Sequence, residues 1–111
     1  MEQIFINPNQ TSGPVKRVWS MGFNTCHAAL MLRDDLFEHV KRSREVGFQY
    51  IRFHNVFSER VGIYKEDYEG CPVYDFTNFD LIYDRIIGSG LLPFFELSTI
   101  PDALRTTDTT I

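Results

Sequence analysis

The chain has no surplus of basic residues and very few cysteines, and both shortages exclude classes of function. Its 11 Lys and Arg face 15 Asp and Glu, for a net charge of −4, so no positive field gathers the phosphates of a nucleic acid. The 2 cysteines, Cys26 and Cys71, form neither a CxxC metal motif nor a disulfide framework. We therefore expect reduced thiols and no nucleic-acid partner.

Long apolar runs and the common catalytic motifs are also missing. No stretch approaches the roughly 18 apolar residues of a membrane span, and the N-terminus lacks the pattern of a signal peptide. We expect a soluble, cytoplasmic protein with no membrane partner, although a trimmed N-terminus would have lost any signal peptide. Neither a GxSxG nucleophile, an HExxH metal motif nor a phosphate-binding loop is present.

The chain does contain apolar and aromatic residues in the proportions of a globular domain. Of its 111 residues, 43% are hydrophobic and 14% aromatic, which argues against disorder and for at most one ordinary domain. A chain this short buries a smaller fraction of its surface than a full-sized enzyme domain. Any core is therefore marginal unless something else covers it.

Apolar runs and helical periods alternate after an irregular lead-in at residues 1–14. Short apolar runs rich in aromatic residues predict strands, and amphipathic segments that stop at glycine predict helices. The expected elements are a strand at Val15–Phe23, a helix that begins at Asp34 or Asp35 and ends just before Gly47, a strand at Phe48–His54, a helix from near Thr77 to a stop at Gly88 or Gly90, and a strand at Leu92–Leu97.

The connecting segments carry weaker signals. Asn55–Asp75 has no sustained period and is expected to be a long loop after a strand, a length more usual for functional loops. Thr77 and Asp80 resemble a weak capping box at the start of the second helix. The tail from Ser98 to Ile111 shows no periodic pattern.

The order strand, helix, strand, helix, strand, with nearly continuous apolar strands, indicates parallel βαβ units in an α/β fold. Two architectures share this order: an open doubly wound sheet, and the start of a (β/α)8 barrel, which needs about 250 residues in full. A nucleotide-binding open sheet has a glycine-rich turn after its first strand, where this chain offers only Gly22. A phosphate-binding sheet is therefore disfavoured.

In both architectures ligands bind at the carboxyl ends of the strands, so polar residues there are candidates. Asn24 follows the first expected strand, Arg52 and His54 close the second, and Glu96 closes the third. Arg52 and His54 are two residues apart and share a strand face. The spacing leaves open whether His54 binds a ligand's hydroxyls or only loop backbone.

Glu96 lies among apolar residues, where a carboxylate must be paired or hydrogen-bonded, or else have a raised pKa. It suits a general acid or a hydroxyl ligand, but a buried salt bridge to Arg52 is an equally good explanation. His39 lies in a charged helix and His27 in an expected loop without a ligand-spaced partner. Both are interpreted as solvated or structural.

Five segments stand in a distinctive order, from YIRFHNVFS to PFFEL. Their order and spacing resemble glycoside hydrolase family 39, from about Val18 to Leu104. The segments are Tyr50–Ser58, Val61–Tyr64, Pro72–Phe76, Phe79–Asp84, and Pro93–Leu97 with Pro101.

The resemblance implies that residues 15–111 form strands 1–3 of a (β/α)8 barrel with the intervening helices. It also implies hydrolysis of β-xylosides, or of iduronosides in animal relatives, with retention of configuration. Such chemistry uses two carboxyl groups about 5 Å apart and no cofactor or metal. Both family glutamates are expected beyond Ile111, so no catalytic residue is assigned in this chain.

Three residues match the family's substrate-binding segments. The resemblance implies that His54 binds the sugar next to the scissile bond, that Glu96 shapes and charges the site, and that Arg52 supports both. The chain departs from the family at Asn55, where glycine is frequent, and at Thr99, where an aromatic residue is frequent. The loss of that aromatic residue weakens the inference about which sugar is bound and leaves the inferred fold intact.

The expected function is thus that of an N-terminal portion of a retaining glycosidase with a carbohydrate substrate. Alone, three strands leave open edges, so self-association of this portion is expected. The alternative is a standalone, non-catalytic α/β module that binds sugar or a partner.

Overall fold

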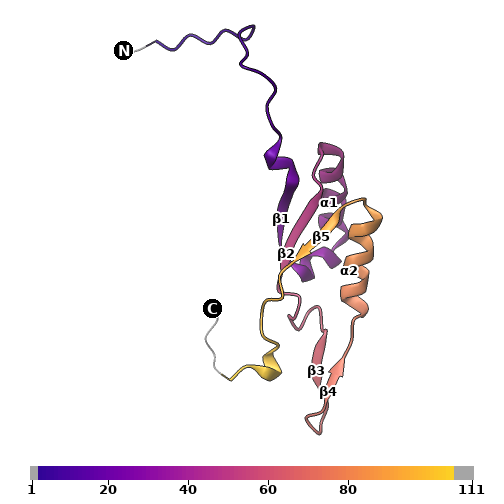
Figure 1. The fold of residues 1–111 in the computed structure, drawn as a ribbon. Coiled ribbons are helices and arrows are strands. Elements are labelled where there is room, and N and C mark those ends of the chain that lie inside the picture. The colour runs from indigo at the N-terminus through magenta and orange to yellow at the C-terminus, as the bar shows by residue number, and fades with distance from the viewer. Residues whose placement is uncertain (1–2, 107–111) are drawn as a thin grey trace.

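A three-stranded parallel sheet with its helices is the centre of the fold (Figure 1). The computed structural model describes residues 3–106. The main elements are β1 (Gly22–His27), α1 (Asp34–Val46), β2 (Tyr50–His54), β3 (Tyr64–Glu66), β4 (Pro72–Tyr74), α2 (Thr77–Gly88) and β5 (Leu92–Phe95). Three 3₁₀ turns lie at Val18–Met21, Ala28–Leu32 and Asp102–Leu104.

The strand order of the sheet agrees with both expected architectures. β2 is central and pairs in parallel with β1 on one side and β5 on the other, with Tyr50 opposite both Gly22 and Leu92. Each new strand is therefore added on the same side as the chain proceeds, as in a barrel and also in one half of a doubly wound sheet, whose order reverses only after that half. The order is the one that the prediction of a partial (β/α)8 barrel requires.

The core lies on one face of this sheet. Ile51 and Phe53 of β2 are fully buried, while their neighbours Tyr50, Arg52 and His54 point the other way and are not buried. Both helices pack against the buried face and contribute to a single apolar cluster. The members from the helices are Phe37, Val40, Ile82 and Ile86.

The opposite face of the sheet is apolar but uncovered. Tyr50 is 39% exposed, Leu92 49% and Phe94 60%, and the register places Phe94 beside Arg52. In a closed barrel this face is the packed interior. The exposed apolar side chains are therefore where the rest of a barrel would pack.

The first strand lies later than predicted. The expected strand at Val15–Phe23 is wrong, because the chain makes a 3₁₀ turn over Val18–Met21 and pairs with β2 only from Gly22. The Ser20 hydroxyl donates to the Arg17 carbonyl at 2.7 Å and stabilises this turn. The apolar side chains of this turn pack against other side chains and do not mark a paired strand. Trp19, for example, meets the Phe48 ring edge-on at 5.7 Å between centroids.

The segment expected to be a loop contains a small antiparallel hairpin. β3 and β4 pair with Tyr64 opposite Tyr74, whose rings meet edge-on at 5.6 Å. The Asp67 carboxylate accepts hydrogen bonds from the N–H groups of Glu69 and Cys71, at 2.9 and 2.8 Å. Strands of three residues are too short to show a period, which is why the sequence pattern missed them.

Helix α1 has the expected bounds, and Gly47 beyond its end has φ of 109° in the left-handed region. Helix α2 begins at Thr77 as expected, but the predicted Thr77 and Asp80 capping box does not form. Instead, the Asp75 carboxylate accepts a hydrogen bond from the Thr77 N–H at 3.0 Å. The cap therefore comes from outside the helix.

The lead-in runs away from the sheet as an extended segment (Figure 1), and Ile4, Phe5 and Ile6 are each exposed by more than 85%. Expectations for residues 1–2 and 107–111 lie outside the described residues. Within residues 3–106, neither helix is long and apolar enough to cross a membrane.

Phe53 tests the position of the core. Phe53→Ala removes a fully buried ring and is expected to lower the free energy of unfolding by about 3–5 kcal/mol. Tyr68→Ala, at a fully exposed aromatic residue, serves as the control and is expected to change it by less than about 0.5 kcal/mol. Urea unfolding followed by circular dichroism measures both. Equal losses in the two variants would contradict the assignment of the core.

Asp75 tests the helix cap through pH. Hydrogen bonds from the Thr77 hydroxyl and N–H lower the pKa of Asp75, so its contribution to stability is present above the unfolded pKa, about 3.9. That contribution is lost as pH falls through the folded value. Asp75→Ala should therefore lower Tm at pH 7 and lose this effect at acidic pH. Asp75→Asn keeps an acceptor and should show a smaller loss; a deficit that grows in acid would contradict the cap.

Candidate functional site

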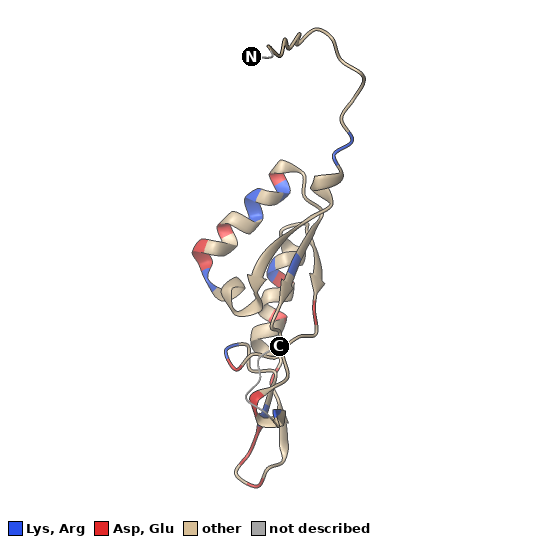
Figure 2. Cartoon of the chain, turned by 90° about the vertical axis from the view of Figure 1, so that its left-hand side faces the viewer, with Lys and Arg blue, Asp and Glu red and all other residues tan. Residues whose placement is uncertain are grey.

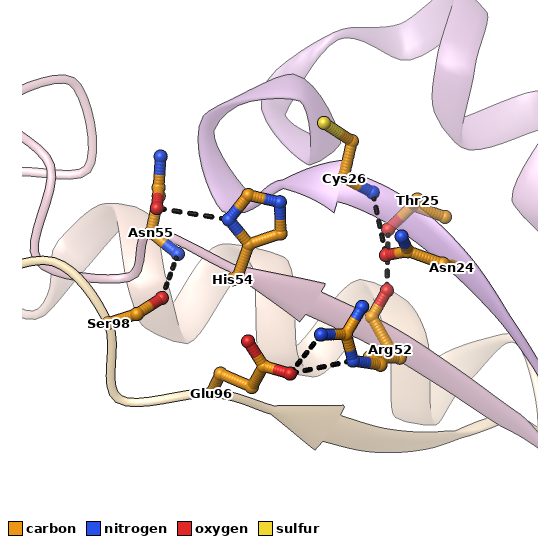
Figure 3. Close-up of polar contacts among 8 residues, drawn as sticks. All are labelled: Asn24, Thr25, Cys26, Arg52, His54, Asn55, Glu96 and Ser98. Atoms are coloured by element: carbon orange, nitrogen blue, oxygen red, sulfur yellow. Dashed lines mark hydrogen bonds and ion pairs between the residues drawn. The ribbon is translucent and has the colours of Figure 1, made fainter. Parts of the chain in front are cut away.

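The carboxyl ends of β1, β2 and β5 bring polar side chains together at one edge of the sheet (Figure 3). His54 closes β2, Glu96 follows β5 directly, and its N–H still donates to the Phe53 carbonyl at 2.9 Å. All three residues expected from the sequence, Arg52, His54 and Glu96, are near this edge. Parallel strands with one shared direction explain this convergence.

Arg52 and Glu96 form an ion pair across β2 and β5. Arg52 Nε donates to Glu96 Oε1 at 2.7 Å, and Nη2 contacts the same oxygen. The expectation of a salt bridge is met, but not that of a buried one, since the side chains are 42% and 40% exposed on the open face. Both bonds use Oε1, so Glu96 keeps Oε2 available to accept from a ligand.

Other charges of the molecule form pairs away from this edge. Positive and negative residues mix along α1 (Figure 2), where Lys41 pairs with Glu38 at 2.6 Å. Arg85 of α2 pairs with Asp34 at 2.8 Å. The Arg52 and Glu96 pair differs from these because it lies on the uncovered face of the sheet.

His54 bonds to a side chain and not to loop backbone. Its Nδ1 lies 3.0 Å from Asn55 Oδ1, so the backbone partner considered from the sequence is not the one found. The Asn55 N–H in turn donates to Ser98 Oγ at 3.1 Å. The ring is therefore oriented by residues from two segments, while its Nε2 is left for another partner.

His27 is the residue that the sequence pattern missed. It was expected in a loop, but it ends β1 opposite His54, and the two rings lie 4.7 Å apart between centroids. Its Nδ1 contacts Asn55 Nδ2. The error follows from the misplaced first strand: a strand ending at Phe23 leaves His27 outside the sheet.

The end of β1 is bent by a local hydrogen bond. Asn24, expected after the strand, lies within it opposite Arg52, and its Oδ1 accepts from the Cys26 N–H at 3.1 Å. Cys26 has a φ of 72°, a left-handed conformation that is uncommon for a residue with a side chain. The pairing register shifts between Asn24 and His27, and this shift brings His27 to His54.

One group of side chains in the described residues has the composition of a metal site. Ligand atoms of Cys26, His27 and His54 all lie within 4.8 Å of one another, and Cys with His is a donor set that Zn²⁺ accepts. However, Asn55 contacts the Nδ1 atoms of both histidines, and a lone pair on both Nε2 atoms would require both Nδ1 atoms to carry protons. The arrangement suits polar ligands better, and the expectation of no metal remains a prediction.

Known proteins align with almost the whole of this chain. The family model of glycosyl hydrolases family 39 matches residues 2–111. The chain is 34% identical over 110 residues to a β-xylosidase of Caldicellulosiruptor saccharolyticus and 35% identical over 108 residues to one of Geobacillus stearothermophilus. These alignments include 98% and 94% of this chain but 22% and 21% of those proteins.

Solved structures agree with the sequence comparison and confirm the prediction of a partial (β/α)8 barrel. A monomeric β-xylosidase from Caulobacter crescentus superposes with a TM-score of 0.79 at 35% identity, over 94% of this chain and 21% of that chain. A family 39 enzyme from Xanthomonas axonopodis gives a TM-score of 0.73 at 35% identity, over 86% of this chain and 19% of that chain. The chain thus spans about a fifth of the length of the relatives that it matches.

Proposed function

Because this chain belongs to glycosyl hydrolases family 39, we propose that it forms the first three strands and two helices of a barrel that hydrolyses β-xylosides. The observation that carries the proposal is the edge where Arg52, His54 and Glu96 meet on the open face. Residues 15–111 are proposed as the barrel portion and 1–14 as a lead-in. A cytoplasmic location also stays a prediction.

The proposed reaction proceeds with retention at the anomeric carbon. One carboxylate attacks that carbon and another carboxyl group protonates the leaving oxygen; water then releases the sugar. Both glutamates are proposed to come from other parts of the barrel. This chain contributes binding: His54 Nε2 accepts from a sugar hydroxyl, and Glu96 Oε2 accepts from another.

Arg52 acts in this proposal through Glu96. Its guanidinium donates twice to Oε1, which fixes the carboxylate and leaves the second oxygen directed at a ligand. Charge-assisted bonds of this kind are roughly twice as strong as neutral ones. In a closed barrel the pair would lie deeper than it does here, and its orientation would matter more.

His54 gives the direct test of this function. In the whole protein, His54→Ala should lower kcat/KM for an aryl β-xyloside by about tenfold or more, as expected for one lost hydrogen bond. His39→Ala is the matched control, because His39 is exposed on α1 and belongs to none of the three strands. An unchanged kcat/KM for His54→Ala, or no hydrolysis by the unmodified protein, would contradict the proposal.

Self-association of the isolated 111-residue chain is also proposed. The exposed residues Leu92 and Phe94 lie on β5, whose outer edge has no neighbour in the described sheet, and such edges favour pairing with another chain. Sedimentation should show species larger than 13.0 kDa, and Phe94→Lys should shift them towards monomer. A monomeric chain at concentrations of tens of micromolar would contradict this expectation.

A further inference from the structure

Asn55 stands between two imidazoles, and the chemistry of its amide constrains both. Its Oδ1 lies 3.0 Å from His54 Nδ1, and its Nδ2 contacts His27 Nδ1. An amide oxygen only accepts hydrogen bonds, and an amide nitrogen only donates them. His54 Nδ1 therefore carries a proton, whereas His27 Nδ1 offers a lone pair.

The two neutral histidines are consequently opposite tautomers. With its proton on Nδ1, His54 has an acceptor lone pair on Nε2; with Nδ1 accepting, His27 has its proton on Nε2 and donates there. Rotating the Asn55 side-chain amide by about 180° would exchange the tautomers of the two rings. The tautomers would still be opposite, because one end of the amide always accepts a hydrogen bond and the other always donates one. The pair thus offers one donor and one acceptor side by side.

The surroundings hold Asn55 in this position. Its φ of 59° lies in the left-handed region, which Asn tolerates better than most residues. Its N–H donates to Ser98 Oγ after β5, as Figure 3 shows. Its amide reaches His27 at the end of β1, so Asn55 connects the ends of all three strands.

His27 also has open space beside it. A hollow is lined by His27, by Ala29 and Leu30 after β1, and by residues 58–60 after β2. Within the described residues, Ser58 Oγ is buried there without a hydrogen-bond partner. His27 is itself an exposed residue. The hollow therefore leaves room for a ligand group beside His27, whose ring lies 4.7 Å from that of His54 between centroids.

We propose that His27 is a second sugar-binding residue beside His54, and that Asn55 is the positioning residue that sets their opposite tautomers. The proposal rests on the function proposed above. Each sugar hydroxyl can both donate and accept, so two neighbouring hydroxyls of a pyranose match an acceptor on His54 and a donor on His27. If both rings were the same tautomer, the pair would offer two donors or two acceptors and not one of each.

The tautomers can be read without any ligand. In the whole protein with ¹⁵N-labelled histidine, imidazole ¹⁵N shifts and couplings distinguish an Nδ1–H from an Nε2–H ring. His27→Gln and His54→Gln assign the signals. The expected result is one ring of each kind. In Asn55→Asp, whose carboxylate accepts at both ends, both rings should become Nδ1–H. The same tautomer on both rings of the unmodified protein would overturn the inference.

Kinetics then test the sugar-binding role. His27→Ala and Asn55→Asp should each lower kcat/KM for an aryl β-xyloside by about tenfold, and the double variant should fall less than the product of the two losses. Asn9→Asp, at an exposed position of the lead-in, is the control and should leave kcat/KM unchanged. Asn55→Gly accommodates the positive φ and, with no amide, should behave like Asn55→Asp in kinetics.

The two proposals fail in distinguishable ways. If the unmodified protein hydrolyses the xyloside and the His27→Ala variant keeps the full kcat/KM, the proposed role of His27 is overturned. The proposed hydrolysis then still stands. A protein that hydrolyses no xyloside overturns the proposed function, and with it the sugar-binding role of His27. The tautomers of the unmodified protein would still decide the positioning role of Asn55.

Discussion

The alternation of side chains along β2 is the constraint on which the rest of the structure depends. Ile51 and Phe53 are fully buried against α1 and α2, and this burial stabilises the only apolar cluster described in residues 3–106. Because successive residues of a strand face opposite ways, the same burial forces Arg52 and His54 onto the other face. The chemistry of the site is therefore a geometric consequence of the core.

The second consequence is an apolar face without a cover. β5 places Leu92 and Phe94 beside Tyr50 and Arg52, where apolar side chains meet water at a cost of about 25 cal/mol per Å² of exposed apolar area. The ion pair of Arg52 with Glu96 is only half-buried for the same reason. Strands that close a barrel would cover this face and would also bury the polar side chains at the strand ends more deeply.

Much of this arrangement could be predicted from the sequence. Helices with acids in the first turn and glycine beyond the end have strong local signals, and both helices begin where they were expected. The aromatic strand expected at Phe48–His54 also forms, but it begins only at Tyr50. The hairpin was missed because three-residue strands have no measurable period. The bend at Cys26 was missed because it depends on one hydrogen bond from Asn24, which no apolar pattern records.

The site was predictable to the same extent as its strands. Arg52, His54 and Glu96 were expected because they follow apolar runs at strand ends, and the pairing of two of them was among the alternatives. His27 could not be found, since its role depends on the true register of β1 with β2. Asn55 was noted only as a departure from the family, whereas its contacts with two histidines appear only in three dimensions.

The most direct measurement is a crystal structure of the whole protein with xylose bound. We predict that other strands bury Tyr50, Leu92 and Phe94, and that a sugar hydroxyl lies within hydrogen-bond distance of His54 Nε2. A structure in which these side chains stay exposed, or in which xylose binds away from the ends of β1, β2 and β5, would contradict this prediction.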